Sequence, residues 1–147
     1  MKLTLLSDYS LRVLMHLAVN KDALVRISDI AARYDISKNH LMKVAHQLGQ
    51  EGFIETVRGR SGGLRLARPA AEINLGLVIR HMEQSSVLVE CFPGGKGGCL
   101  ITKECRLKSI LAGAQTAFFE HLDGYTLADL VGENNPLEQL LLENAAS

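Results

Sequence analysis

Apolar residues near the start of the chain recur at intervals of three and four, the spacing that places side chains on one face of a helix. This pattern predicts a first helix that ends near Asn20. Ser7 or Asp8 is its expected N-cap, because a short polar side chain accepts a hydrogen bond from the free N–H groups of the first turn. The residues on its apolar face are Leu11, Leu14, Met15 and Ala18.

A short helix, a tight turn and a third helix are predicted next. The short helix lies within residues 27–35, and Ser37 is the expected N-cap of the third helix. Gly49 and Gly52 mark the end of that helix, whose apolar face contains Leu41, Val44, Ala45 and Leu48. This succession is typical of a helix-turn-helix motif.

Two short strands are predicted directly after this motif. Residues 53–57 alternate in polarity as a strand does, residues 58–63 form a basic, glycine-rich turn, and residues 64–66 return. A two-stranded hairpin with a basic tip, placed after a helix-turn-helix, predicts the wing of a winged-helix domain.

The second half of the chain is predicted to be helical. After Pro69, one helix extends from about Leu75 to Glu83, and a longer one from about Arg106 to Asp123. The longer helix would measure about 27 Å at 1.5 Å per residue. A small winged domain does not need such a helix, so we expect it to form a dimer contact rather than to pack only on its own domain. Its apolar stripe consists of Leu107, Ile110, Leu111, Ala114, Ala117, Phe118 and Leu122.

The tail from Tyr125 to Glu143 is expected to form short helical segments around Pro136 that pack against the long helix. The predicted fold class is therefore mainly α with a small β wing: a winged helix-turn-helix domain plus a long dimerisation helix. We place the DNA-binding domain at residues 1–68, and the cysteine loop and dimerisation helices at residues 69–147.

The net charge of zero conceals an uneven distribution. Residues 1–68 carry eleven Lys and Arg against six Asp and Glu, a net charge of +5, and the remaining residues carry a net charge of −5. A basic half that also contains a helix-turn-helix pattern is a candidate partner for double-stranded DNA.

The residues expected to contact DNA lie at the start of the third helix and at the tip of the wing. A recognition helix presents its N-terminal residues to base edges, so Asn39 and His40 are candidates for reading bases and Lys43 for binding phosphate. The two wing arginines flank a glycine, which suits an approach to the minor groove. The full candidate set is Ser37, Lys38, Asn39, His40, Lys43, Arg58 and Arg60.

All three cysteines, Cys91, Cys99 and Cys105, lie within fifteen residues. Three thiolates leave a tetrahedral metal or an iron–sulfur cluster one ligand short, so a fourth ligand must come from elsewhere in the fold, from a second subunit or from an exchangeable group. Inert thiols, or one disulfide and a spare thiol, are the alternatives. The polar, flexible residues 94–98 argue against a buried, inert cluster.

The N-terminus lacks the features of a signal peptide, and no window is long and apolar enough to span a membrane. We therefore expect a cytoplasmic protein without a membrane partner, in which clustered cysteines serve as metal ligands or redox groups. An enzyme with Cys105 as nucleophile is disfavoured, because no histidine is locally placed to activate a cysteine. The glycine run lacks the spacing of a phosphate loop.

Several segments together resemble the iron–sulfur winged-helix repressors of bacteria, most closely the members that sense nitric oxide. The resemblance covers nearly the whole chain. It is carried by Leu3-Thr4, Asp8-Tyr9, residues 37–41, residues 57–66, the three cysteines and residues 125–130.

The resemblance implies a homodimer that holds a [2Fe-2S] or [4Fe-4S] cluster through Cys91, Cys99, Cys105 and, from the partner subunit, Asp8. It also implies that nitric oxide dismantles the cluster, so that the repressor releases its operator DNA. The operator would be an inverted repeat, and the repressed genes would detoxify nitric oxide. The gap of seven residues between Cys91 and Cys99 is five in some relatives, which leaves the cluster type open.

Two alternatives stay open. An IscR-like or RirA-like regulator would sense cluster or iron supply with the same architecture, although Lys108 stands where IscR-like proteins have a histidine ligand. A structural zinc site, completed by a histidine or by Asp8, would make the protein a colourless winged-helix regulator.

Overall fold

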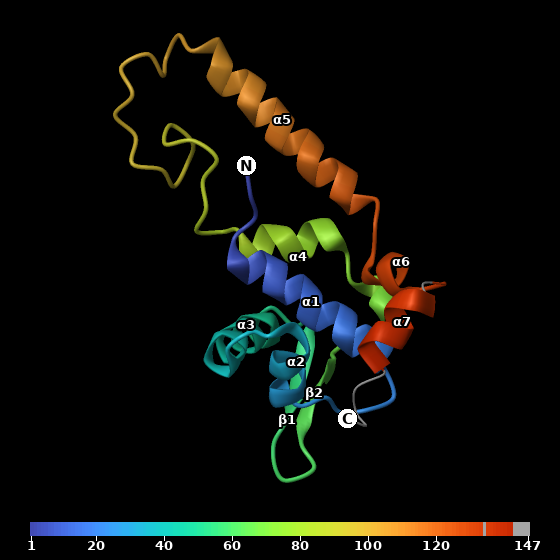
Figure 1. The fold of residues 1–147 in the computed structure, drawn as a ribbon. Helices are drawn as coiled ribbons and strands as arrows, with labels where there is room; N and C mark the ends of the chain where they lie inside the picture. Colours follow the sequence, from blue (N-terminus) through green and yellow to red (C-terminus); the bar gives the residue numbers. More distant parts are fainter. Residues whose placement is uncertain (134, 143–147) are drawn as a thin grey trace.

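Helix α1 (Leu5–Val19) lies at the centre of the computed structural model, which describes residues 1–133 and 135–142 (Figure 1). The helix-turn-helix and the wing pack on one side of α1, and the later helices pack on another. The remaining elements are α2 (Ile27–Tyr34), α3 (Lys38–Gln50), β1 (Ile54–Val57), β2 (Gly63–Leu66), a 3₁₀ turn η1 (Ala70–Glu72), α4 (Leu75–Met82), α5 (Arg106–Asp123), α6 (Leu127–Val131) and α7 (Asn135–Leu142).

The N-cap of α1 is Thr4, so the expectation of Ser7 or Asp8 was wrong. The Thr4 hydroxyl accepts a hydrogen bond from the Ser7 N–H at 3.2 Å, and Thr4 has the extended backbone of a cap residue. The apolar periodicity does not show that the helix begins three residues earlier. Ser7 is instead fully buried within the first turn.

The turn between α2 and α3 follows the prediction. Asp35 ends α2 in the left-handed conformation, with φ 52°, which Asp tolerates better than most residues. The Ser37 hydroxyl then accepts a hydrogen bond from the His40 N–H at 3.1 Å, which confirms Ser37 as the N-cap of α3. The inner faces bury Leu14, Leu17, Ile30, Leu41, Leu48 and Phe53 almost completely.

The wing is a two-stranded antiparallel sheet in which Ile54 pairs with Leu66 and Val57 with Gly63. A third segment joins its edge, because Val25 and Leu64 exchange two backbone hydrogen bonds of 3.0 and 2.7 Å. Gly63 permits this approach, since a Cβ atom there would lie 2.8 Å from the carbonyl oxygen of Val25. The wing is thereby fixed to Val25, two residues before the start of α2.

Apolar residues from both halves of the chain form one core. Ile73, Val78, Met82 and Leu127 are buried together with the α1 and α3 residues. The tail was expected to pack against the long helix, but α6 and α7 pack against α1, because η1 and the Asn74–Thr126 bridge bring the chain back there. The predicted end of the tail at Glu143 lies outside the described residues.

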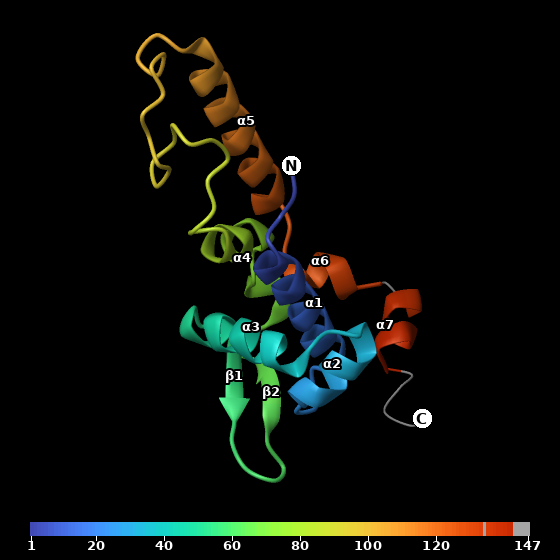
Figure 2. The same ribbon diagram turned by 60° about the vertical axis from the view of Figure 1, so that its left-hand side comes forward.

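Helix α5 has the predicted bounds and extends away from the core in both views (Figures 1 and 2). It contacts α4, yet none of its residues is buried. Within the described residues, no helix has the length and apolar character needed to cross a membrane.

Candidate nucleic-acid interface and metal-ligand loop

The start of α3 presents most of the predicted DNA-contacting residues to solvent. Lys38, Asn39 and Lys43 are exposed, as a recognition helix requires. His40 is half-buried, and its ring makes an edge contact with the ring of Tyr9 at 4.8 Å between centroids. This contact joins the recognition helix to the first helix.

Sequence reasoning missed two residues on the same exposed face of α3. Met42 is 50% exposed, and His46 is exposed one helical turn further on. Their spacing from Asn39, three and seven residues, is the signal that places them on this face. An exposed thioether beside Asn39 offers an apolar contact of the kind that thymine methyl groups accept.

The wing arginines differ in their partners. Arg58 and Arg60 at the tip are exposed, and Gly59 between them has φ 109°. Neither forms an ion pair with a carboxylate in the part of the chain that the structure describes. Arg65 on β2, by contrast, pairs with Glu55 on the neighbouring strand at 2.9 Å. The tip cations are therefore available to an external anion.

The three cysteines are free thiols in the loop between α4 and α5, which runs beside α5 in both views (Figures 1 and 2). Cys99 is exposed, Cys91 is half-buried, and half-buried Cys105 is the N-cap residue of α5. The middle of the loop is folded on itself, because Gly97 N–H donates to the Glu90 carbonyl at 3.1 Å.

Across residues 1–133 and 135–142, no three His, Cys, Asp or Glu side chains of this single chain lie close enough together to hold a metal ion. The donor set nevertheless fits an iron–sulfur cluster in its chemistry: three unpaired thiols in one loop are the ligand type that such clusters take. The thiols would supply three ligands, and a fourth would come from elsewhere in the fold, from a second subunit or from an exchangeable group.

Asp8, the predicted fourth ligand, is engaged by Arg12 one turn further along α1. The Arg12 guanidinium donates to both carboxylate oxygens, at 3.2 and 3.0 Å, and the Asp8 side chain remains 44% exposed. The same guanidinium carbon lies 5.7 Å from the ring centroids of Tyr9 and Tyr34. Because Tyr9 contacts His40, a continuous row of contacts leads from Asp8 to α3.

Glu83, at the C-terminus of α4, was also missed by sequence reasoning. Its Oε1 atom accepts hydrogen bonds from the backbone N–H and the hydroxyl of Thr4, both at 2.8 Å, and from the hydroxyl of Ser7. Partial burial opposes ionisation, but hydrogen bonds from Ser7, Thr4 and Ser86 outweigh it and lower the pKa of the Glu83 carboxyl. Glu83 thus fixes the start of α1, four residues before Asp8, to the base of the cysteine loop.

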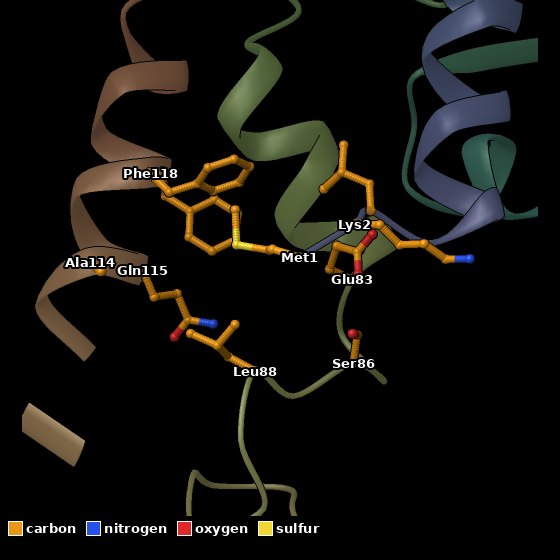
Figure 3. Close-up of a pocket in the computed structure, with 10 residues that line it drawn as sticks. Met1, Lys2, Glu83, Ser86, Leu88, Ala114, Gln115 and Phe118 are labelled. Atoms are coloured by element: carbon orange, nitrogen blue, oxygen red, sulfur yellow. The ribbon is translucent and has the colours of Figure 1, made fainter. Parts of the chain in front are cut away.

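A cavity of about 320 Å³ opens beside Glu83. The N-terminal residues, the start of the cysteine loop and the inner face of α5 surround it (Figure 3). Met1, Leu88 and Phe118 make it mostly apolar. The inner face of α5 therefore borders open space here rather than a closed core.

A family model described as Rrf2, iron-dependent transcriptional regulator, matches residues 3–133. The HTH-type transcriptional regulator NsrR of Bacillus licheniformis is 51% identical over 96% of this chain and 99% of that protein. NsrR of Bacillus subtilis is 49% identical over 96% of this chain and 97% of that protein. Among solved structures, T. potens IscR matches with a TM-score of 0.70 and 26% identity, covering 92% of this chain and 90% of that one.

These matches confirm the mainly helical winged fold and the family resemblance read from the sequence. The relatives are named transcriptional regulators, which rules out the cysteine enzyme considered above and confirms DNA as a partner. The chain belongs to the Rrf2 family of transcriptional regulators.

Proposed function

We propose that this regulator is a homodimeric repressor that releases its operator when nitric oxide reaches an iron–sulfur cluster. Cys91, Cys99 and Cys105 of one subunit and Asp8 of the partner subunit are the proposed ligands. The segments that resemble nitric-oxide-sensing repressors and the 51% identity with a regulator named NsrR support this choice of signal. The row of contacts from Asp8 through Arg12 and Tyr9 to His40 is the structural observation that carries it.

The proposed ligand set is unequal. Three thiolates are soft ligands that suit iron–sulfur clusters, whereas a carboxylate is hard and forms the weakest of the four bonds. When bound, the cluster supplies iron atoms to which nitric oxide binds. The carboxylate of Asp8 has an alternative partner in Arg12, so it is not left unpaired when it is released.

The residues around Asp8 explain how its release reaches DNA. Arg12 lies between Asp8 and the rings of Tyr9 and Tyr34, so a change in the position of Asp8 alters the support of both rings. An exposed ion pair contributes about 0.2–1 kcal/mol. A tenfold change in DNA affinity needs about 1.4 kcal/mol. The Asp8–Arg12 pair alone therefore cannot account for a tenfold change in DNA affinity. In this proposal the ligand bond between subunits supplies the remaining free energy.

Helix α5 is the proposed dimer contact. Leu107 and Ile110 on its apolar stripe are 59% and 66% exposed. Complete burial of an exposed Leu or Ile side chain stabilises a complex by up to about 1.5–3 kcal/mol. A second copy of the same helix would bury such side chains along the whole stripe. A twofold dimer would present its two α3 helices about 34 Å apart, matching an inverted repeat.

Within this dimer, residues 1–68 would contact DNA and residues 69–147 would carry the cluster and the dimer contact. The proposed DNA contacts are Lys38, Asn39, His40 and Lys43 on α3, with Arg58 and Arg60 on the wing. Ser37 serves them as the N-cap that fixes the start of α3.

A second candidate is a regulator of iron or cluster supply, of the IscR or RirA type. The family description as iron-dependent and the match to T. potens IscR favour it. Lys108 disfavours the IscR type, because a protonated lysine cannot replace the histidine ligand. The architecture would be the same, so the signal alone distinguishes the two candidates.

The test is anaerobic purification with iron and sulfide counting, followed by titration with nitric oxide, oxygen and an iron chelator. The proposal expects a coloured dimer that loses operator affinity with nitric oxide at lower doses than with the other two. A colourless protein that contains zinc would support the structural-zinc alternative. Release by the chelator with no response to nitric oxide would support the iron-supply regulator.

A further inference from the structure

A cleft of about 650 Å³ separates the wing from the start of the helix-turn-helix. Three cationic side chains border it, Arg26 before α2, Lys38 at the start of α3 and Arg60 at the wing tip. All three residues are exposed, and no carboxylate is among the residues that line the cleft. Like charges that border one cleft repel one another unless an anion lies between them.

The backbone holds Arg26 in place. Val25, the residue before it, exchanges two hydrogen bonds with Leu64 of β2, so Arg26 begins beside the wing. From there its Nη2 atom donates to the carbonyl oxygen of Arg60 at 3.1 Å. A guanidinium has five N–H donors, so this contact leaves four for another acceptor.

The cations that border the cleft differ from three arginines elsewhere in the described residues. Arg12, Arg65 and Arg80 each pair with a carboxylate. Arg26, Lys38 and Arg60 form no ion pair with a carboxylate anywhere in residues 1–133 and 135–142. The unpaired cations that border the cleft come from the α3 and wing surfaces that the proposed function assigns to DNA.

We propose that this cleft binds one phosphodiester of the DNA backbone. In this proposal Arg26 both binds the phosphate and supports the wing through its hydrogen bond to Arg60. This inference rests on the proposed DNA interface, but not on nitric oxide or the cluster. Arg26 can bind the phosphate in a forked geometry while its other arm holds the Arg60 carbonyl. Lys38 and Arg60 complete the positive border.

The test compares Arg26→Gln with Arg68→Gln in the full-length, anaerobically prepared protein. Arg68 is a matched control, because its Nη2 also donates to a backbone carbonyl, that of Gly52, at 3.1 Å, and it does not line the cleft. Binding to a short mixed-sequence duplex is measured over a series of salt concentrations. The slope of log K against log salt is negative, and loss of one phosphate contact reduces its magnitude by about 0.9.

We expect this smaller slope magnitude in Arg26→Gln and an unchanged slope in Arg68→Gln. Arg26→Lys, which keeps the charge, should retain the wild-type slope. A loss of affinity at an unchanged slope in Arg26→Gln would show that Arg26 only supports the wing, and it would overturn the proposal. So would an equal fall in slope magnitude for both glutamine variants.

A second measurement uses operator duplexes in which single phosphates are replaced by uncharged methylphosphonates. At one position, replacing the phosphate should weaken binding of the wild type but not of Arg26→Gln. If the losses from the two changes instead add at every phosphate position, the assignment is contradicted. A wild-type protein that binds no duplex would overturn the proposed function. A wild type that binds normally, with a slope insensitive to Arg26, would overturn this inference alone.

Discussion

Glu83 joins two segments of the chain that lie 79 residues apart. Its carboxylate accepts hydrogen bonds from Thr4 and Ser7, and Ser7 is fully buried. Removing the carboxylate would therefore leave a buried hydroxyl without its acceptor, which costs more than the bond itself contributes. The Glu83 carboxylate therefore helps to hold the start of α1 against the end of α4.

Glu83→Ala is expected to lower the free energy of unfolding by about 1–3 kcal/mol near neutral pH. Because the folded-state pKa of Glu83 is lowered, its contribution is present above its ordinary pKa and is lost as the pH falls through the folded-state value. The difference between wild type and variant should therefore shrink in acid, as measured by urea unfolding. Glu72→Ala, at an exposed position, serves as the control and should show no such difference.

His16 is buried in α1, and its Nδ1 atom has no hydrogen-bond partner among the residues that the structure describes. Burial, and then the nearby Arg33, lower its pKa. The unfolded chain then binds a proton more readily than the folded one, so stability falls as the pH drops below the ordinary histidine value. His16→Leu should flatten this dependence between about pH 8 and pH 5 in thermal unfolding. An equally steep dependence in the variant would assign the effect to other groups.

At the scale of elements, we expect α3 to divide its exposed residues between two tasks. Asn39 lies where a side chain can reach a base edge, and Lys43 lies one turn further on. Base contacts carry sequence information, whereas phosphate contacts add affinity on any sequence. The two residues should therefore respond differently when the DNA sequence is changed.

Asn39→Ala is expected to weaken operator binding by about 1–3 kcal/mol and to leave binding to mixed-sequence DNA nearly unchanged. Lys43→Ala should weaken both by similar factors and reduce the magnitude of the salt slope by about 0.9. Fluorescence anisotropy on the two duplexes measures each quantity. Equal losses on both duplexes for Asn39→Ala would remove its role as a base reader.

Helix α5 exposes part of its apolar stripe to solvent, above all Leu107 and Ile110. Ile110→Glu places a charge in the middle of this stripe and is expected to convert the dimer into a monomer. Thr116→Glu places the same charge on the opposite face and should leave the dimer intact. Sedimentation velocity distinguishes these states, and a dimer that survives Ile110→Glu would place the contact elsewhere.

Local patterns predicted most elements of the fold. The bounds of α5, the Ser37 cap and the two wing strands follow from periodicity, capping preference and turn residues within a few positions of one another. The Thr4 cap was missed because apolar spacing fixes a helical face better than a helix end. Packing of α6 and α7 on α1 was missed because it depends on where the chain returns after α5.

The candidate site also divides into local features, which the sequence predicts, and long-range contacts, which it does not. The exposed start of α3 and the wing tip were predicted, because both belong to motifs that are local in sequence. Glu83 and the Arg26 contact with the wing join residues that are distant along the chain, so no local pattern indicates them. The cysteines were identified by their clustering, but their assembly with Asp8 depends on a second subunit and stays a prediction.

At the scale of the whole molecule, switching requires that the state of Asp8 alter the DNA-reading surface. In the proposed switch, Arg12 is the candidate link between the two, because it binds both oxygens of Asp8 and lies against the rings of Tyr9 and Tyr34. Lysine at this position would keep the charge but lose the forked contact and the planar stacking.

Arg12→Lys is therefore expected to keep the iron content and visible spectrum of the wild type while reducing the ratio of operator affinities between cluster-loaded and cluster-free protein. Arg106→Lys, a matched change at the exposed start of α5, should leave that ratio unchanged. Both affinities are measured anaerobically on the same operator. Because coupling is a difference between two states, a variant that weakens both states equally would show that Arg12 supports the fold or DNA binding without transmitting the signal. A reduced ratio with an intact cluster would place Arg12 on the route between the metal site and the double helix.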